Sequence, residues 1–221
     1  MYSTSQALQE PRFGIDLQQC VVSGSSAGAL VATLLAAGVN IHDVKEWLVD
    51  SPELHGMFNS SFGGAFKMRD MLIKILDTFL PKNVERVNGK LYILLCSEKS
   101  GLYFVNNFRS RKDLIEAVAA SGHVPIFSDG TYSVKFRGEP HVDGDWKSTR
   151  DATTLCRSRT CPKLFFDHND DKAMHATDKA SFYQVTNFRT HLLRYSYGVS
   201  YVYAMSSRGE LDDMPVFKAD G

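Results

Sequence analysis

Residues 21–30, Val-Val-Ser-Gly-Ser-Ser-Ala-Gly-Ala-Leu, place a short apolar run before the pattern Gly-x-Ser-x-Gly and an Ala- and Leu-rich run after it. We expect a strand, a tight turn and a helix here. Gly24 and Gly28 lack a Cβ, so the backbone can bend sharply and the helix can pack close to the strand. This order is the context of a nucleophile elbow, which would hold the hydroxyl of Ser26 out at the strand's end. The alternative is a Gly- and Ser-rich turn without chemistry.

The composition limits the classes of protein to consider. With 221 residues, 43% of them hydrophobic, the chain is long enough for one sizeable core, and we expect a single domain over residues 1–221. Lys and Arg number 25, as do Asp and Glu, so the basic surface that nucleic-acid binding needs is not indicated. The most apolar run, residues 91–96, has the length of a strand rather than of a membrane-spanning helix. No signal-peptide pattern is visible at the N-terminus.

The cysteines favour neither a disulfide scaffold nor a metal site. Four cysteines are too few for a disulfide framework in a chain of this length, and we expect Cys20 and Cys96 to be buried thiols. A metal-binding alternative would use Cys156, Cys161, His168 and His175. Their spacing does not match that of structural zinc sites, so we expect no metal and no cofactor.

Strand-like and helix-like segments alternate along the chain, which predicts an α/β layered domain. We expect helices at residues 29–37, 41–48, 68–80 and 111–121, with Asn40 and Ser110 as N-caps. We expect strands at residues 91–96, 102–105, 131–136 and 139–142. The periodicity weakens beyond residue 146, where we expect a last strand at residues 182–185 and a last helix at residues 187–205.

Asp143 is the second candidate for chemistry. It follows an apolar strand and precedes Gly144, which places it at a strand's end, where the active-site residues of open α/β sheets gather. A serine hydroxyl needs a positioned base to accept its proton. A free Asp, with a pKa near 3.9, is a weak base in water, but it can serve in a partly desolvated contact with Ser26. The alternative is an ordinary Asp-Gly turn.

Three segments together resemble the patatin-like phospholipase family. Residues 24–30 resemble its nucleophile elbow, residues 113–126 its helix followed by an Ala-Ser and x-Pro turn, and residues 141–144 its Asp-Gly signature. The resemblance is strong over about residues 2–146 and weak over residues 147–221. It implies a three-layer α/β/α sandwich with a mostly parallel central sheet.

The resemblance also implies a chemistry. Ser26 would be the nucleophile and Asp143 the base of a dyad that hydrolyses acyl esters of glycerolipids or phospholipids through an acyl-enzyme, without metal. The backbone N–H of Ala27 would be a partial oxyanion donor. The substrate implies an intracellular, cytoplasmic protein, peripheral to a membrane or a lipid droplet.

The chain departs from the family pattern in two places. The Gly-rich oxyanion loop that precedes the elbow in the family is missing, since Gly14 is the only glycine before the elbow. We therefore expect either a truncated form that begins just after the loop or a poorly active relative, because one lost oxyanion donor costs about a hundred- to a thousand-fold in rate. Asp145 stands where the family has Gly or Ala, which adds a like charge near Asp143.

Two other functions remain open. A Ser-Asp-His α/β-hydrolase would use Ser26, Asp143 and one of three later histidines, but that fold needs several strands before its elbow. The histidines are His168, His175 and His191. A non-enzymatic module for a lipid surface or a protein partner would use the basic, amphipathic helix at residues 68–80, or aromatic residues such as Phe58, Phe62 and Phe66. We expect that helix to pack its apolar stripe inside the domain instead.

Overall fold

The computed structural model describes residues 8–13, 15–52 and 66–144. The described strands are β1 (Val22–Gly24), β2 (Leu91–Ser97), β3 (Gly101–Val105), β4 (Val134–Phe136) and β5 (Glu139–Val142). The described α-helices are α2 (Ala27–Ala36), α3 (Ile41–Asp50), α5 (Met68–Phe79) and α6 (Arg111–Ser121), and the 3-10 turns are η1 (Pro11–Phe13) and η2 (Glu85–Val87). The strand and helix predicted at residues 182–205 lie outside the described residues.

The four predicted helices are confirmed, with ends that lie within two residues of the expected positions. The Asn40 side chain accepts a hydrogen bond from the His42 N–H at 2.9 Å, and the Ser110 hydroxyl accepts one from the Asp113 N–H at 3.1 Å. Each therefore satisfies a backbone donor in the first turn of its helix. Gly38, which follows α2, has a φ of 71°, the left-handed conformation typical of a glycine after a helix.

The sheet is mixed. β1 runs parallel to β2, whereas β3 and β5 run antiparallel to β2, and β4 runs antiparallel to β5. Residues 98–100 join β2 to β3 and residues 137–138 join β4 to β5, and such short turns allow only antiparallel pairing. One of the four described pairings is thus parallel, where we expected a mostly parallel sheet.

β1 and β5 share one edge of β2. β3 pairs with β2 from Ile93 to Ser97 and occupies the other edge over that length. β1 pairs with β2 up to Ile93, and β5 pairs with Cys96 and Ser97. Because β1 and β5 run in opposite directions, their C-terminal ends face each other along this edge, with only Leu94 and Leu95 of β2 between them.

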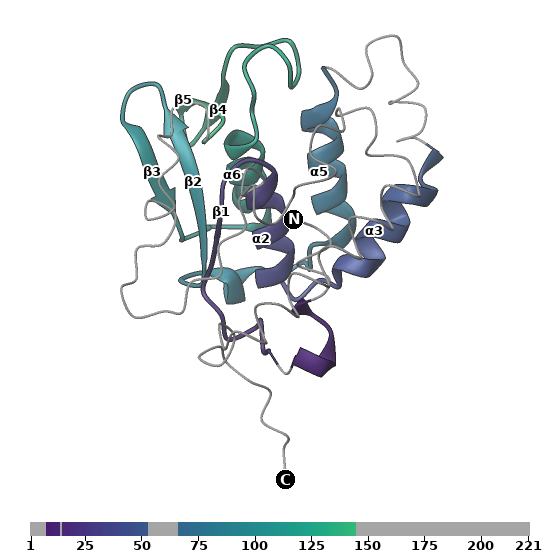
Figure 1. The fold of residues 1–221 in the computed structure, drawn as a ribbon. Helices are drawn as coiled ribbons and strands as arrows, with labels where there is room; N and C mark the ends of the chain where they lie inside the picture. The colour runs from purple at the N-terminus through teal and green to yellow at the C-terminus, as the bar shows by residue number, and fades with distance from the viewer. Residues whose placement is uncertain (1–7, 14, 53–65, 145–221) are drawn as a thin grey trace, which may run out of the picture.

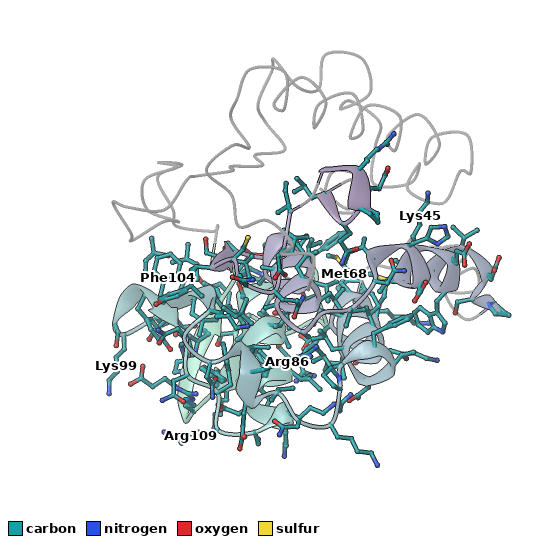
Figure 2. The ribbon with its side chains drawn as sticks, turned by 90° about the horizontal axis from the view of Figure 1, so that it is seen from below. Lys45, Met68, Arg86, Lys99, Phe104 and Arg109 are labelled. Atoms are coloured by element: carbon teal, nitrogen blue, oxygen red, sulfur yellow. The ribbon has the colours of Figure 1, made fainter. Side chains whose placement is uncertain are left out.

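The helices form layers beside the sheet. α2 packs on β1 and β2, α6 packs on β2, β4 and β5, and α5 packs against both helices (Figure 1). Seen from below, Lys45 of α3 and Lys99 of the β2–β3 turn lie at opposite sides of the molecule, with the packed elements between them (Figure 2). The predicted α/β layering is confirmed.

Both faces of the central strand are buried. Leu91, Ile93 and Leu95 belong to the main hydrophobic cluster, and Leu94 and Cys96, which alternate with them, are buried as well. This near-continuous burial is typical of a strand inside a layered α/β domain.

The apolar stripe of α5 faces inward, as expected: Leu72, Ile75 and Leu76 are at most 9% exposed. The stripe is therefore not a free amphipathic surface. No helix in the described part of the chain is long and apolar enough to cross a membrane.

Candidate active site

Ser26 lies on a strained turn between β1 and α2. Its φ is 54° and its ψ is −128°, and it forms the N-cap of α2. A non-glycine residue at positive φ is uncommon, and such strain persists only where the surroundings enforce it. A Cβ at Gly24 would lie 2.2 Å from the carbonyl oxygen of Gly28, so the turn requires a glycine at that position. The strand–turn–helix predicted around Ser26 is confirmed.

The converging ends of β1 and β5 bring Ser26 and Asp143 together. Asp143 directly follows β5, and its side chain lies against the elbow although 117 positions separate the two residues. The Ser26 hydroxyl donates a hydrogen bond to Asp143 Oδ2 at 2.6 Å. Asp143 is 3% exposed, whereas Ser26 is half-buried. This geometry allows the serine proton to pass to the carboxylate.

Ser121, the last residue of α6, joins the elements around this pair. Its hydroxyl accepts a hydrogen bond from the Ser26 N–H at 3.0 Å and donates one to the Leu94 carbonyl at 2.7 Å. Its carbonyl accepts a hydrogen bond from the Gly144 N–H at 3.0 Å. Ser121 is fully buried, so each of these bonds replaces contact with water. Ser121 therefore forms hydrogen bonds to the elbow, to β2 and to the residues that follow β5.

Gly144 and His123 hold the aspartate from its other side. A Cβ at Gly144 would lie 2.5 Å from the Leu94 carbonyl oxygen and 2.5 Å from Ser25 Oγ, so only glycine fits there. The Asp143 N–H donates to the His123 carbonyl at 2.8 Å. The backbone around Asp143 is thus bonded to α6 and to the loop that follows it.

Ala27 presents the amide that we expected as an oxyanion donor. Ser121 occupies the Ser26 N–H, and the Gly28 and Ala29 N–H groups bond to carbonyls within the turn. The Ala27 N–H takes part in no hydrogen bond with any described residue, and Ala27 is exposed. It lies in the first turn of α2, whose N-terminal end carries partial positive charge that favours a nearby anion.

The described histidines do not form a triad with this pair. His141 is buried, with Nε2 at 2.7 Å from the Tyr103 hydroxyl and Nδ1 at 2.9 Å from the Glu139 carbonyl. His123 is buried with Nε2 at 3.2 Å from the Thr131 carbonyl.

Other candidates from the sequence lie outside the described residues. They are Asp145, Cys156, Cys161, His168, His175 and His191, together with Phe58 and Phe62. Among the residues that the structure describes, no group of three His, Cys, Asp or Glu side chains is placed to hold a metal.

Ser26 and Asp143 were candidates from the sequence, whereas Ser121 was not. The sequence drew attention to residues 113–126 only through a family resemblance. A contact between residues 95 positions apart leaves no local signal in a single sequence.

These features define an α/β layered domain that presents a serine on a strand–turn–helix elbow against a buried aspartate. The chain belongs to the patatin-like phospholipase family, whose model matches residues 6–154. The predicted family and the predicted α/β layered class are thereby confirmed.

Curated relatives include several acyl-transfer proteins. The chain is 28% identical to mouse omega-hydroxyceramide transacylase over 162 residues, which covers 66% of this chain and 27% of the relative. It is 30% identical to human patatin-like phospholipase domain-containing protein 4 over 128 residues, covering 55% and 49% of the two chains. It is 31% identical to human 1-acylglycerol-3-phosphate O-acyltransferase PNPLA3 over 128 residues, covering 55% and 26%. The match therefore spans less than half the length of each of these relatives.

Proposed function

We propose that this chain is a serine acyl hydrolase that cleaves acyl esters of glycerolipids or phospholipids, with Ser26 as nucleophile and Asp143 as base. The observation that carries the proposal is the 2.6 Å hydrogen bond from the Ser26 hydroxyl to the buried Asp143 carboxylate. Membership of a family of lipid hydrolases and acyltransferases supports the substrate class.

In the proposed reaction Asp143 accepts the hydroxyl proton while Ser26 Oγ attacks the ester carbonyl. The Ala27 N–H donates to the resulting oxyanion at the N-terminal end of α2. The alcohol leaves with the proton held by Asp143, and the acyl group stays on Ser26. Water then attacks the acyl-enzyme, Asp143 accepts a proton from that water, and Ser26 regains its proton as the fatty acid leaves.

A lipid alcohol is a second candidate, besides water, for the acceptor of the acyl group. Relatives of this chain are named a transacylase and an O-acyltransferase. A lipid hydroxyl in place of water would turn the same acyl-enzyme into a transacylation. Product analysis with and without an added lipid alcohol separates the two outcomes.

The test is labelling of the full chain with a fluorophosphonate probe, which reacts with activated serines. We expect labelling of the wild-type chain, none of Ser26→Ala, and retained labelling of Ser25→Ala. Ser25 is the matched control because its buried hydroxyl has no hydrogen-bond partner among the residues that the structure describes. Asp143→Asn should slow labelling at least about a hundredfold, as expected for loss of a general base.

Cleavage of a soluble short-chain ester should follow the same order among the variants. Labelling that survives Ser26→Ala would contradict the assigned nucleophile, and labelling unaffected by Asp143→Asn would contradict the base. A wild-type chain that binds lipid vesicles but takes no probe would instead indicate the non-enzymatic lipid-surface module.

A further inference from the structure

A group of exposed apolar side chains surrounds the loop between α6 and β4. Six large hydrophobic residues are exposed in the described part of the chain, and four of them gather here. They are Phe66 at 46%, Ile126 at 53%, Phe127 at 43% and Tyr132 at 58% exposure. We call these four residues the apolar tip.

Backbone hydrogen bonds hold the apolar tip together. The Phe66 N–H donates to the Phe127 carbonyl at 2.8 Å, which joins the segment before α5 to the loop. The Ile126 N–H donates to the Thr131 carbonyl at 2.7 Å, which closes the loop on itself. The four side chains are therefore carried by one bonded unit rather than by separate segments.

Two residues of the apolar tip have a backbone conformation that their side chains disfavour. Phe66 has a φ of 68° and Ile126 a φ of 67°. Positive φ is a clear outlier for a β-branched residue such as isoleucine. Strain of this kind clusters at sites that bind or switch. Here it maintains two apolar side chains in solvent-exposed positions.

The loop that carries the apolar tip begins at the candidate active site. Ser121 bonds to the Ser26 N–H, and the His123 carbonyl accepts from the Asp143 N–H. In Figure 1 the connection between α6 and β4 extends beyond the elbow, next to the start of α5. A surface that contacts the apolar tip would thus come close to Ser26.

The size and charge of the apolar tip favour a lipid surface as its occupant. At about half exposure, the three aromatic side chains, of roughly 150–250 Å² each, present together with Ile126 about 400 Å². Stable protein interfaces bury about 800 Å² per partner, so this patch alone is too small for a stable dimer. The charged side chains nearby have no net charge. Arg69 Nε lies 3.8 Å from Asp129 Oδ2, and the exposed Lys67 and Asp70 carry opposite charges. Aromatic and aliphatic side chains without net charge suit the interface of a neutral phospholipid layer.

We propose that the apolar tip is a docking surface for neutral phospholipid layers, which inserts at the interface and places Ser26 beside the esters of lipid molecules. This inference rests on the proposed function of Ser26 for the identity of the substrate. The docking itself is tested separately, so that the two can fail independently.

The test uses the full chain and a variant with Ile126→Asn and Tyr132→Ser. Asparagine tolerates positive φ better than isoleucine, so the change removes apolar surface without adding strain. Val21→Asn is the matched control, because Val21 is also β-branched and 52% exposed but precedes β1, at its end opposite to the elbow. Binding to phosphatidylcholine vesicles is measured by co-flotation, and serine reactivity by the fluorophosphonate probe.

We expect the double variant to lose at least tenfold in vesicle binding and in hydrolysis of vesicle-borne esters, with probe labelling unchanged within twofold. Val21→Asn should match the wild type, and 0.5 M NaCl should change binding less than twofold. The docking proposal is overturned if the wild-type chain does not bind the vesicles, or if the double variant binds them as well as the wild type. It is also overturned if Val21→Asn loses as much binding as the double variant. A wild-type dimer that the double variant dissociates would assign the apolar tip to a second copy instead. Tip-dependent vesicle binding by a chain that takes no probe would support docking and contradict the catalytic proposal.

Discussion

The hydroxyl of Ser121 accepts a hydrogen bond from the backbone N–H of Ser26 at 3.0 Å. It thereby fixes the elbow to the end of α6 and removes the Ser26 N–H from the donors that could face a substrate. The same hydroxyl donates to Leu94 in the central strand. The orientation of the candidate nucleophile therefore depends on a residue that need not touch substrate.

Ser121→Ala tests this dependence. It leaves the N–H of the half-buried Ser26 and the buried Leu94 carbonyl without their shared partner, so we expect the free energy of unfolding to fall by about 1–3 kcal/mol. Fluorophosphonate labelling of Ser26, measured well below the melting temperature, should slow by about ten- to a hundredfold because the elbow loses its alignment. Ser100→Ala, in the exposed β2–β3 turn, should change neither quantity. An unchanged labelling rate in a destabilised Ser121→Ala chain would limit Ser121 to a structural role.

Strain at Ser26 predicts an order of stability among its variants. Glycine accepts positive φ without a steric penalty, whereas alanine does not. Ser26→Gly should therefore be more stable to urea than Ser26→Ala by about 1 kcal/mol, which is at the low end of the strain of such residues. Neither variant should take the probe. Equal stability of the two would mean that the turn relaxes when the hydroxyl is removed.

The space around Gly144 predicts a sharp effect of a single methyl group. In Gly144→Ala the new Cβ would meet the Leu94 carbonyl oxygen at 2.5 Å, so Asp143 or β2 must shift. We expect at least about a hundredfold slower probe labelling, the cost typical of a misplacement near 1 Å. Gly89→Ala is the control: its Cβ has open space, and only its φ of 77° is unfavourable. It should lose about 1 kcal/mol of stability and keep full labelling. Equal labelling of both variants would contradict the close packing of Gly144.

The ion pair of Asp113 with Arg137 predicts that the domain loses stability as the pH falls below about 4. Burial would raise the pKa of Asp113, but hydrogen bonds from the Arg137 side chain and the Arg109 N–H outweigh it, and the pKa lies below its ordinary value of 3.8. Because the folded-state pKa is depressed, the carboxylate stabilises the fold fully above about pH 4, and this contribution is lost as the pH falls through the folded-state value.

Asp113→Asn should therefore lower the free energy of urea unfolding at pH 6, and the difference from the wild type should shrink below about pH 4. The exposed Asp70→Asn serves as control and should follow the wild type across the range. A difference that stays constant from pH 6 to pH 2 would mean that the ion pair does not contribute through its charge.

Local signals in the sequence predicted much of the fold. Asn40 and Ser110 cap helices through their own side chains, and Gly24 stands where the turn at Ser26 needs a glycine. Such effects act over a few residues, so the chain alone indicates them.

The remaining features depend on long-range packing. β1 and β5 pair with the same edge of β2 through contacts between distant segments of the chain. The hydrogen bond between Ser121 and Ser26 likewise joins residues far apart in the sequence. The exposure of Ile126 also depends on how the loop closes, since an apolar residue in a Gly- and Pro-containing segment reads equally well as core.

Because β1 and β5 meet end to end along β2, their pairing with β2 determines the distance between Ser26 and Asp143. The smallest slip that keeps the same side chains on the same face is two residues, and it would slide either strand by about 6.6 Å. That displacement exceeds the length of any hydrogen bond, so a misaligned domain would lose the contact between Ser26 and Asp143 even if its core were intact. The three-residue interval from Ile93 to Cys96 therefore sets the gap between Ser26 and Asp143, and an insertion or deletion within it should separate the two side chains.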